Sequence, residues 1–445
     1  MNEKIVERLY FHNPWWQEGK ISSNLALPFK RKIFFELLEK MNLGRILILR
    51  GPRRTGKTTI IYQIIENLLA QGVKPFNILY LSFDDIDLRV RLSEILKVWE
   101  KEAKQVLEKE PLLYLFLDEV QFLDFWEIDV KLFYDKKYPI VFFASGSSTS
   151  LIRKTTESLS GRTFEKTLLP FDFQEFLYFE GESVGFKKEN LGKLRRNEIS
   201  FVPFETKLFL LWEKYLERGG FPHLLKLPSS DWKWAVKEDI VDKVLYRDLV
   251  QLYGIREPET LERMFRYVAE VSSGVLNLSD LSSNLKISWE SAQNYLTYLK
   301  QAFLIFTLPK YSRSPKETAR SLEKVHVVDS AIMSIFSQSK KAALWETVVA
   351  RHLWETWGRN TYFWRNTREV DIVLEDNRKL LPVEVKSSEK VDAKDLKGLT
   401  YFMKKFGSPR GIVFYSGKER LEKVGVGEIF FYPVYKLGFN LLKKL

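Results

Sequence analysis

Five short apolar runs, most of them separated by longer helix-like segments, occupy the first 170 residues of the chain. The runs are RILILR (45–50), NILYLSF (77–83), LLYLFLDE (112–119), YPIVFFASGSS (138–148) and TFEKTLLP (163–170). Strands that are apolar along their whole length and alternate with helices are typical of a parallel sheet covered on both faces. The pattern therefore predicts an α/β domain in this part of the chain.

The pattern becomes mainly helical from 171 to 250, which predicts a lid and connector, and three further helical segments follow. They are EPETLERMFRYVAEVSS (257–273), SDLSSNLKIS (279–288) and WESAQNYLTYLKQAFLIFTL (289–308). Ser279 and Asp280 are the predicted caps of the second segment, because short polar side chains accept the first free N–H groups of a helix. The spacing predicts a helix-turn-helix within a winged helix, with YSRSPKETARSLEK (311–324) as its basic wing.

The third of these segments is the candidate contact with nucleic acid. Its polar or aromatic residues that are candidates to reach a duplex are Trp289, Gln293, Asn294 and Lys300. The segment carries few positive charges, and winged helices also serve as docking modules for proteins. Contact with DNA and contact with a protein partner therefore both remain open.

The composition limits the possible classes of protein. A chain of 445 residues is too long for one domain of roughly 100 to 200 residues, and its apolar runs are shorter than the roughly 20 residues of a membrane span. The chain has no cysteine and no apolar signal segment at its start, so we expect a cytoplasmic protein without a membrane anchor. With four histidines and no cysteine, any metal ion is expected on carboxylates.

The formal net charge of +12 favours polyanionic partners such as nucleic acid, although a charge-rich solvated surface explains it equally well.

A phosphate-binding motif directly follows the first apolar run. GPRRTGKTT fits the pattern G-x-x-x-x-G-K-[ST], and it places backbone N–H groups, a helix N-terminus and a lysine around phosphate oxygens. The alternative is a glycine-rich turn with a surface lysine. The predicted nucleotide-binding residues are Gly51, Pro52, Arg53, Arg54, Thr55, Gly56, Lys57, Thr58 and Thr59.

Polar residues at later strand ends complete a predicted site for ATP hydrolysis. Asp118 is expected to hold Mg²⁺ together with Thr58, and Glu119 is expected to activate the attacking water. Ser145 or Ser147 is a candidate sensor of the γ-phosphate, or part of an ordinary Ser/Gly turn.

Arg162 is a candidate arginine finger that acts on the nucleotide of a neighbouring subunit, or else the partner in a local salt bridge. Arg153 is a weaker candidate for the same role.

Charged residues also alternate with apolar ones near the C-terminus, in EVDIVLED (369–376) and LLPVEVKSS (380–388). If the turn between the two strands is centred between Asn377 and Arg378, Asp371 falls opposite Glu384. Two facing carboxylates favour a bridging Mg²⁺ or Mn²⁺, and Lys386 on the same face would stabilise a developing phosphorane.

Two observations argue against this metal site. Lys386 also falls opposite Glu369, so the face is equally explained by a ladder of ion pairs. Pro382 indicates an edge strand or a bulge, and a bulge would move Asp371 away from Glu384.

Several motifs together resemble those of archaeal and bacterial AAA-type ATPases that carry a C-terminal domain of uncharacterised function. They are HNPWW, GPRRTGKTT, LFLDEVQ, SGRTFE, LPFDFQEFL and YLERGGFPHLL. The resemblance implies a RecA-like sheet in the order 5-1-4-3-2, a helical lid, a winged helix and a nuclease-like C-terminal domain. In HNPWW, aromatic packing that anchors the N-terminal arm is favoured over stacking on adenine.

The C-terminal strands are similar to the core of the restriction-endonuclease-like superfamily, which carries an Asp and an E-x-K triplet on adjacent strands and often a Glu on the preceding helix. The matching positions are Asp371, Glu384, Lys386 and, on the helix LWETVVARHLWETWG, Glu346. The expected domains are an arm (1–30), an ATPase core (31–170), a lid (171–250), a winged helix (251–330) and a nuclease-like domain (331–445).

We therefore expect an ATP-driven enzyme that processes or remodels DNA, with ATP, ADP and DNA as partners and possible assembly with a protein partner or with further copies of itself. The alternative is a regulatory ATPase switch whose C-terminal domain binds without catalysing. A toxin–antitoxin or defence component is a third interpretation.

Overall fold

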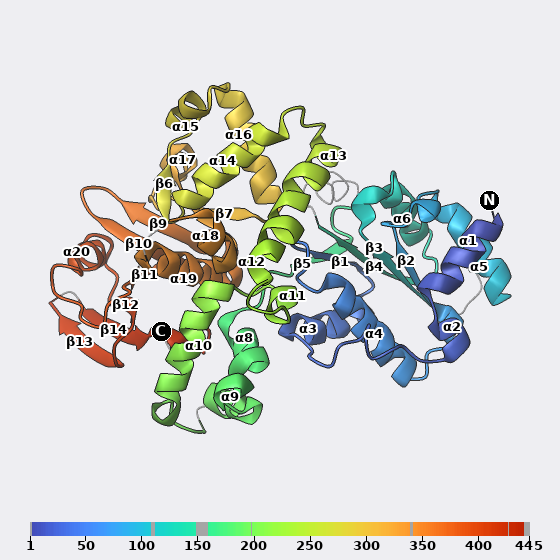
Figure 1. Ribbon diagram of the computed structural model, residues 1–445, viewed down its shortest axis with the longest axis horizontal. Helices are drawn as coiled ribbons and strands as arrows, with labels where there is room; N and C mark the ends of the chain where they lie inside the picture. The colour runs from blue at the N-terminus through green and yellow to red at the C-terminus, as the bar shows by residue number, and fades with distance from the viewer. Residues whose placement is uncertain are drawn as a thin grey trace. The chain divides into compact units, whose positions relative to one another are not determined.

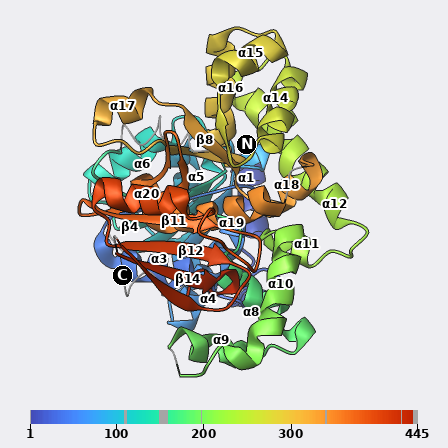
Figure 2. The same cartoon turned by 90° about the vertical axis from the view of Figure 1, so that its left-hand side faces the viewer.

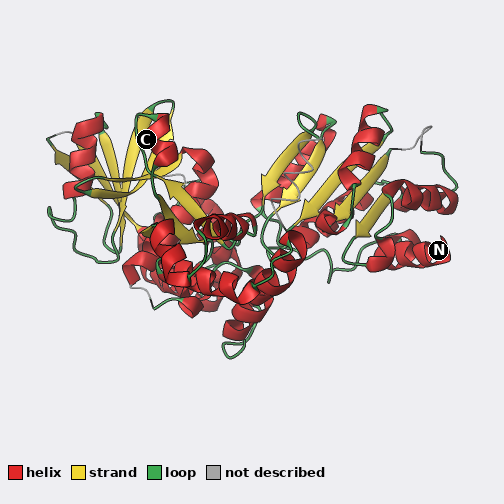
Figure 3. Ribbon diagram, turned by 90° about the horizontal axis from the view of Figure 1, so that it is seen from above, coloured by secondary structure: helices red, strands yellow, loops and turns green. Residues whose placement is uncertain are grey.

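The computed structural model describes residues 2–107, 112–147, 159–196, 198–338, 341–425 and 427–439 (Figure 1). The chain divides into two compact units, Met1–Leu168 and Leu169–Leu445. Each unit has its own large sheet flanked by helices (Figure 3). Among the described residues, no helix combines the length and the apolar character that crossing a membrane requires.

The first unit is built on a five-stranded parallel sheet in the order β2-β3-β4-β1-β5. Its strands are β1 (Ile46–Arg50), β2 (Ile78–Ser82), β3 (Leu113–Asp118), β4 (Ile140–Gly146) and β5 (Thr163–Thr167). This is the predicted order 5-1-4-3-2 counted from the other edge, so the α/β fold class and the RecA-like topology are confirmed. Strands β1, β2 and β3 are nearly continuous runs of buried residues because helices cover both faces, whereas the edge strand β5 is half-buried along its length.

Four helices of at least two turns flank this sheet in the described part of the unit after the N-terminal arm. They are α3 (Lys32–Lys40), α4 (Lys57–Ala70), α5 (Leu92–Ala103) and α6 (Trp126–Asp135). The connections β1-α4-β2 and β2-α5-β3 run in opposite directions along the sheet, and the right-handed crossover rule therefore places α4 and α5 on opposite faces.

The N-terminal arm completes the edge of this sheet at β2. It consists of α1 (Asn2–His12) and α2 (Trp15–Glu18). The Asn13 amide accepts from Tyr80 N at 2.7 Å and donates to Tyr80 O at 2.9 Å, and so replaces a missing neighbouring strand. Both indole N–H groups of Trp15 and Trp16 donate to Ile78 O. The tryptophans are buried and anchor the arm, as the favoured interpretation of HNPWW predicts.

The second unit begins with helices, as predicted for residues 171 to 250. They are α8 (Phe173–Glu180), α9 (Lys188–Arg195), α10 (Glu205–Arg218), α11 (Pro222–Leu225), α12 (Trp232–Ala235) and α13 (Leu249–Tyr253), with a π-helix, Val236–Asp248, between the last two.

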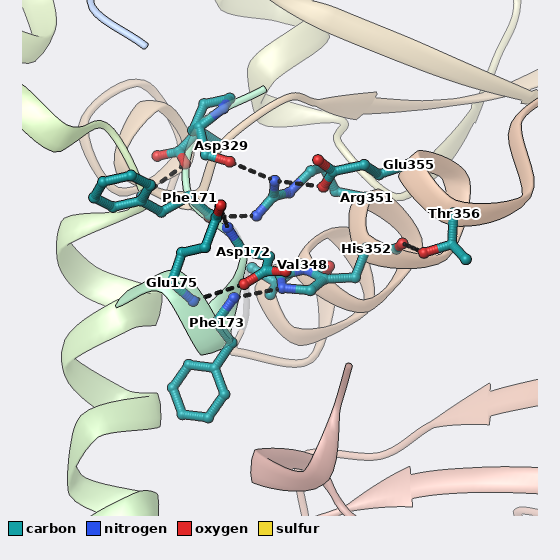
Figure 4. A network of polar contacts seen from close by, with 12 residues as sticks. Phe171, Asp172, Phe173, Glu175, Asp329, Val348, Arg351, His352, Glu355 and Thr356 are labelled. Atoms are coloured by element: carbon teal, nitrogen blue, oxygen red, sulfur yellow. Dashed lines mark hydrogen bonds and ion pairs between the residues drawn. The ribbon is translucent and has the colours of Figure 1, made fainter. Parts of the chain in front are cut away.

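A buried arginine fixes the first residues of the second unit (Figure 4). Arg351 is 2% exposed and donates to Pro170 O at 2.9 Å and to Phe171 O at 2.8 Å. Next to it, Phe173 N donates to His352 Nε2 at 2.8 Å, and the other ring nitrogen lies 3.0 Å from Val348 O. His352 is therefore the neutral tautomer with its proton on Nδ1. These contacts tie the segment that follows β5 to helix α19 (Lys341–Trp357).

The region predicted as a winged helix follows. It contains α14 (Pro258–Glu270), α15 (Leu278–Leu285), α16 (Trp289–Gln301) and a sheet in the order β6-β8-β7, formed by β6 (Gly274–Leu276), β7 (Ile305–Pro309) and β8 (Glu323–Val327). Helix α17 (Pro315–Arg320) lies in the predicted wing. The predicted caps of α15 were wrong, because the Asn277 side chain accepts the N–H groups of Ser279 and Asp280 and the helix begins earlier.

The C-terminal sheet has six strands in the order β13-β14-β12-β11-β10-β9, and Figure 2 shows β11, β12 and β14 next to one another. They are β9 (Thr361–Arg365), β10 (Glu369–Asp376), β11 (Lys379–Val385), β12 (Arg410–Tyr415), β13 (Arg420–Val424) and β14 (Gly427–Pro433). Its helical neighbours are α19 and α20 (Lys397–Phe406), whereas α18 (Ser330–Phe336) packs with β8 and α14. Ile372 and Leu374 pack in the cluster that includes α19, whereas Val373 packs with α20, so the two helices cover opposite faces.

The predicted register of β10 and β11 is confirmed from Ile372↔Val383 to Asp376↔Lys379. Asn377 and Arg378 both adopt positive φ, at 49° and 67°, as a two-residue hairpin turn requires.

The expectation that Pro382 marks an edge or a bulge was wrong. Strand β11 lies between β10 and β12, and its pairing with β12 begins at Val383, so that ladder does not require a proline N–H. The irregularity lies instead between β10 and β9, from Val370 to Val373.

The edge contact of the arm gives a first prediction. Asn13→Ala removes both hydrogen bonds to Tyr80 and leaves two backbone groups without partners. We expect the free energy of unfolding of the first unit to fall by about 1–3 kcal/mol in urea unfolding. The control Asn24→Ala changes an exposed side chain and should stay within about 0.5 kcal/mol of the unchanged protein. Equal losses in both variants contradict the role of Asn13.

Candidate functional site

The loop between β1 and α4 has a backbone that only glycine permits at two positions. A Cβ atom on Gly51, whose φ is +157°, would lie 2.1 Å from Leu168 O. Gly56 has a φ of +96°. Leu168 N also donates to Arg50 O at 2.7 Å, so the chain leaving β5 holds the start of the loop. The glycines predicted from the motif are thus required by the backbone itself.

Lys57 is buried, and its ammonium group lies against the loop that precedes it. Its Nζ donates to Gly51 O and to Pro52 O, at 3.0 Å each. The loop is braced by Thr55 Oγ1, which donates to Pro52 O at 2.9 Å, and by Arg31, whose guanidinium donates to Thr55 O at 3.3 Å. A charged group held beside a turn of backbone amides at a helix N-terminus is suited to binding phosphate.

Arg31 was not predicted. Arg53 and Thr59 are half-buried and Arg54 is exposed, and their predicted contacts with a nucleotide stay predictions.

Asp118 is the centre of a hydrogen-bond cluster at the end of β3. Its Oδ2 accepts from Thr58 Oγ1 at 2.7 Å and from Tyr80 OH at 2.9 Å, and its Oδ1 accepts from Ser145 Oγ. Burial, followed by the charge of Glu119, raises the pKa of Asp118. A hydroxyl and a carboxylate side by side are hard oxygen donors, so these two residues fit a Mg²⁺ ion. Tyr80 was not predicted, because its strand reads as uniformly apolar.

Glu119 lies beside a residue whose role the sequence interpretation missed. Gln121 Nε2 donates to Glu119 Oε2 and, at 2.9 Å, to Ser147 Oγ. Gln121 therefore connects the two strand ends and holds the predicted water-activating carboxylate in place. It belongs to the motif LFLDEVQ, which is the only signal that the sequence offers for it.

Ser145 is fully buried and bonded to Asp118, whereas Ser147 is 8% exposed. The predicted sensing of the γ-phosphate stays a prediction for both.

Arg162 forms a local ion pair. Its Nε lies 2.8 Å from Asp135 Oδ1 and its Nη2 donates to Asp135 Oδ2 at 3.1 Å. This is the contact that the alternative interpretation predicts, and the finger role in a neighbouring subunit stays a prediction. Arg153 lies outside the described residues.

A second charged cluster lies in the C-terminal domain, at the predicted metal site. Asp371 Oδ2 accepts from Val385 N at 2.8 Å, and Lys386 Nζ donates to Glu384 Oε1 at 2.7 Å. The alternative ion pair between Lys386 and Glu369 is not among the contacts of the described residues. The predicted neighbours Asp371, Glu384 and Lys386 thus meet, together with Glu346 from α19, but all four are engaged by groups of the protein.

The partner of Glu346 is Lys324, which the sequence interpretation assigned to the basic wing. Its side chain is 1% exposed and belongs to β8. Lys324 Nζ lies 2.5 Å from Glu346 Oε1, 2.6 Å from Glu369 Oε1 and 3.9 Å from Asp371 Oδ1. The assignment of Lys324 to an exposed basic surface was therefore wrong.

Burial dominates the electrostatics of this cluster. It raises the pKa of Glu346 to about 8, against the opposing charge of Lys324. Burial, followed by the charge of Asp371, raises the pKa of Glu384 well above its ordinary value. Burial alone would lower the pKa of Lys324, but Glu346 and the other carboxylates outweigh it and raise that pKa, so the lysine stays charged. The cluster thus carries less negative charge than its carboxyl groups suggest.

The described residues include no group of three or more His, Asp or Glu side chains arranged to hold a metal ion. Glu384 Oε2 is a buried oxygen without a hydrogen-bond partner in this part of the chain.

Three of the four predicted contact residues, Trp289, Gln293 and Lys300, line part of a cavity of about 1020 Å³ in the second unit, and Asn294 does not. Trp289 is 55% exposed, Asn294 is exposed and Gln293 is half-buried. Lys300 Nζ pairs with Glu323 at 2.5 Å. The cavity is lined by Trp289, Gln293, Lys300, Arg313 and Arg320, among others, so aromatic and basic side chains meet there.

Family models match three consecutive parts of the chain. A model described as AAA domain matches residues 43–177, and two models of domains of unknown function, DUF8612 and DUF4143, match residues 210–342 and 341–437. Together with the parallel sheet and its loop, the first match shows that the N-terminal unit has the fold of an AAA-type P-loop ATPase. The match to DUF4143 does not show a restriction-endonuclease-like domain.

The chain is similar to uncharacterized proteins of an archaeon and a bacterium. It is 28% identical over 408 residues to a protein of Methanocaldococcus jannaschii, covering 85% of this chain and 86% of the relative. It is 24% identical over 310 residues to a protein of Haemophilus influenzae, covering 67% of this chain and 70% of the relative.

Among solved structures, the Walker-type ATPase PABY2304 of Pyrococcus abyssi matches with a TM-score of 0.42 and 15% identity, covering 69% of this chain and 95% of that chain. AMPPCP-bound DnaA from Aquifex aeolicus matches with a TM-score of 0.26 and 18% identity, covering 65% and 92%.

The close approach of Gly51 to Leu168 gives a second prediction. Gly51→Ala places a methyl group against a backbone oxygen and displaces the loop, so we expect a fluorescent ATP analogue to bind about 100-fold more weakly. The control Gly72→Ala also has a positive φ, +85°, but meets no atom within 4 Å, and its affinity should be unchanged. Normal affinity of Gly51→Ala would show that the loop does not bind the nucleotide.

Proposed function

We propose that this protein hydrolyses ATP with Mg²⁺, on the premise that residues 43–177 form an AAA-type P-loop ATPase domain. The observation that carries the proposal is the hydrogen bond of 2.7 Å between Thr58 Oγ1 and Asp118 Oδ2. It joins the start of the helix after the phosphate-binding loop to the strand end that carries Glu119. Residues for holding phosphate, holding a cation and activating water therefore meet in one place.

Each residue has a defined task in this proposal. Lys57 leaves the carbonyl groups of the loop to bind the outer phosphates, because a charged phosphate oxygen is a stronger acceptor than a neutral carbonyl. Thr58 and Asp118 would hold the Mg²⁺ ion, which supplies a positive charge that stabilises the transferred phosphoryl group. Tyr80 and Ser145 keep the Asp118 carboxylate oriented toward Thr58.

Glu119 accepts the proton of the attacking water, and Gln121 positions the Glu119 carboxylate. The backbone of Glu119 has a φ of +54°, a conformation that few residues other than glycine adopt. Strain of this kind persists where the surrounding contacts fix the residue, and the bond from Gln121 is one such contact.

Arg162 acts in this proposal on the nucleotide of a second copy of the chain. For this step Arg162 must leave its ion pair with Asp135 and bind the nucleotide instead. The side chains of Arg162 and Asp135 are 32% and 43% exposed. An ion pair this exposed contributes only about 0–1 kcal/mol, so the exchange costs little. The arrangement requires that the protein assemble with itself when it hydrolyses ATP.

The proposed target of the second unit is DNA. What supports it is the exposed Trp289 on α16 and the basic residues that share its cavity, because base stacking and phosphate contacts are the usual parts of nucleic-acid binding. Remodelling of DNA is the work that the ATPase would drive.

Asp371 and Glu384 accept hydrogen bonds from groups of the protein itself. This favours a C-terminal domain that binds its partner without cleaving nucleic acid. A regulatory ATPase switch directed at a protein is the second candidate function, and the winged helix serves it equally well as a docking module.

Glu119→Gln tests the hydrolytic part of the proposal. The amide cannot accept a proton, so we expect the turnover number for ATP to fall by about 100-fold or more while nucleotide affinity is kept. Phosphate release with Mg²⁺, and again after addition of EDTA, measures it. The control Asp124→Asn changes an exposed carboxylate on the same loop and should hydrolyse ATP normally. Unchanged turnover by Glu119→Gln would exclude Glu119 as the base.

The proposal that the second unit acts on DNA predicts that DNA raises the rate of ATP hydrolysis. Single-stranded, duplex or branched DNA should stimulate ATP hydrolysis severalfold, and the effect should weaken as salt rises because phosphate contacts are screened. Trp289→Ala should reduce the stimulation, whereas Trp234→Ala, a tryptophan that is 63% exposed but does not line the cavity, should keep it. Absence of stimulation by every DNA structure would favour the protein-directed switch.

A further inference from the structure

The acidic cluster of the C-terminal domain contains a lysine from another part of the second unit. Four carboxylates meet there: Glu346 from α19, Glu369 and Asp371 from β10, and Glu384 from β11. Lys324 reaches them from β8 of the winged helix. In the superfamily that the strands resemble, such carboxylates hold a divalent cation, so the position of this lysine decides whether a cation fits.

Lys324 uses the oxygens that a cation would need. Its Nζ lies 2.5 Å from Glu346 Oε1 and 2.6 Å from Glu369 Oε1, and Asp371 Oδ1 is 3.9 Å away. The ammonium group therefore lies between carboxylates of α19 and β10, next to the predicted ligand Asp371.

The other oxygens of the cluster are largely used as well. Asp371 Oδ2 accepts the N–H of Val385, and Glu384 Oε1 accepts from Lys386 Nζ. Glu384 Oε2 is the buried oxygen left without a partner among the described residues. Mg²⁺ needs near-octahedral oxygen ligands at about 2.0–2.1 Å, and an ammonium group already lies between two of the carboxylates. The residues present therefore do not fit a divalent cation.

Lys324 is held in the cluster by burial and by the position of its backbone. Its side chain is 1% exposed, and its backbone lies in the middle strand of the small sheet, where residue 324 is the partner of Val275 on β6 and of Leu308 on β7. The ammonium group therefore has almost no contact with solvent, and the backbone that carries it is fixed by two strand ladders. The ion cluster is thus part of the folded second unit.

We infer that Lys324 is a permanent internal substitute for the divalent cation, so that this domain binds no metal at Asp371 and Glu384 and does not cleave phosphodiesters there. The ammonium group joins the wing strand β8 to α19 and β10. Its role is structural, and it holds the winged helix and the C-terminal sheet together as one platform. This inference does not depend on ATP hydrolysis by the first unit.

Binding of Mn²⁺ to the full-length chain without nucleotide tests the inference. Electron paramagnetic resonance titration counts bound Mn²⁺ in the unchanged protein, in Asp371→Asn and in Lys324→Met. We expect the unchanged protein and Asp371→Asn to bind equal numbers of ions, because no ion is held at Asp371. Lys324→Met should bind one additional ion, since removal of the ammonium group frees the carboxylates of Glu346 and Glu369.

An ion that the unchanged protein binds and that Asp371→Asn loses would overturn the inference. So would a folded Lys324→Met protein that gains no ion.

Thermal unfolding provides a readout that remains valid if Lys324→Met folds poorly. Loss of the lysine leaves buried carboxylates without a counter-charge, and we expect the melting temperature of the second unit to fall by roughly 10 °C. The double variant Lys324→Met/Glu346→Gln also replaces the partner carboxyl group by a neutral amide and should recover most of that loss. The control Lys300→Met breaks an ion pair whose side chains are 31% and 38% exposed, so its melting temperature should change little.

A Lys324→Met protein that melts like the Lys300→Met control would also overturn the inference.

Discussion

The nucleotide loop depends on a backbone contact between the ends of two neighbouring strands, β1 and β5. The carbonyl oxygen of Leu168 occupies the place where a side chain at position 51 would begin, and the N–H of Leu168 donates to Arg50 O. This contact fixes the start of the loop, and the loop in turn places Lys57 and Thr58 at the first turn of α4. The residue that supports the loop is thus the last one of the first unit.

The segment that follows this contact is held equally firmly in the second unit. Arg351 binds the carbonyl groups of Pro170 and Phe171, and His352 accepts the N–H of Phe173. Both are buried residues of α19, the helix that also carries Glu346 into the cluster around Lys324. Along the chain, only a few residues separate Leu168, which supports the nucleotide loop, from Pro170, Phe171 and Phe173, which are bound by Arg351 and His352.

Much of this architecture could be predicted from the sequence because it depends on local patterns. Apolar runs and the glycine motif predict the five strands and the loop, and the hairpin turn at Asn377 and Arg378 predicts the register of β10 and β11. These features follow from the period of a strand and from the few residues that tolerate positive φ.

Other features could not be predicted because their partners are distant in sequence. Gln121 and Tyr80 gain their roles only when strands β2, β3 and β4 lie side by side. Lys324 occurs in a run of exposed and charged residues, and nothing local distinguishes a lysine that points to solvent from one that enters an acidic cluster. Several carboxylates surround Lys324 and stabilise its buried charge, and that arrangement exists only in the folded unit.

The central claim is that the loop after β1 binds the triphosphate of ATP through its amides and Lys57 and that hydrolysis follows. The most direct measurement is the release of phosphate from ATP by the purified chain and by Lys57→Ala, each with Mg²⁺ and with EDTA. The account predicts Mg²⁺-dependent release that falls about 100-fold or more in Lys57→Ala, since a charge that stabilises the transferred phosphoryl group is lost. Equal rates in the two proteins, or no release by the unchanged chain, would contradict it.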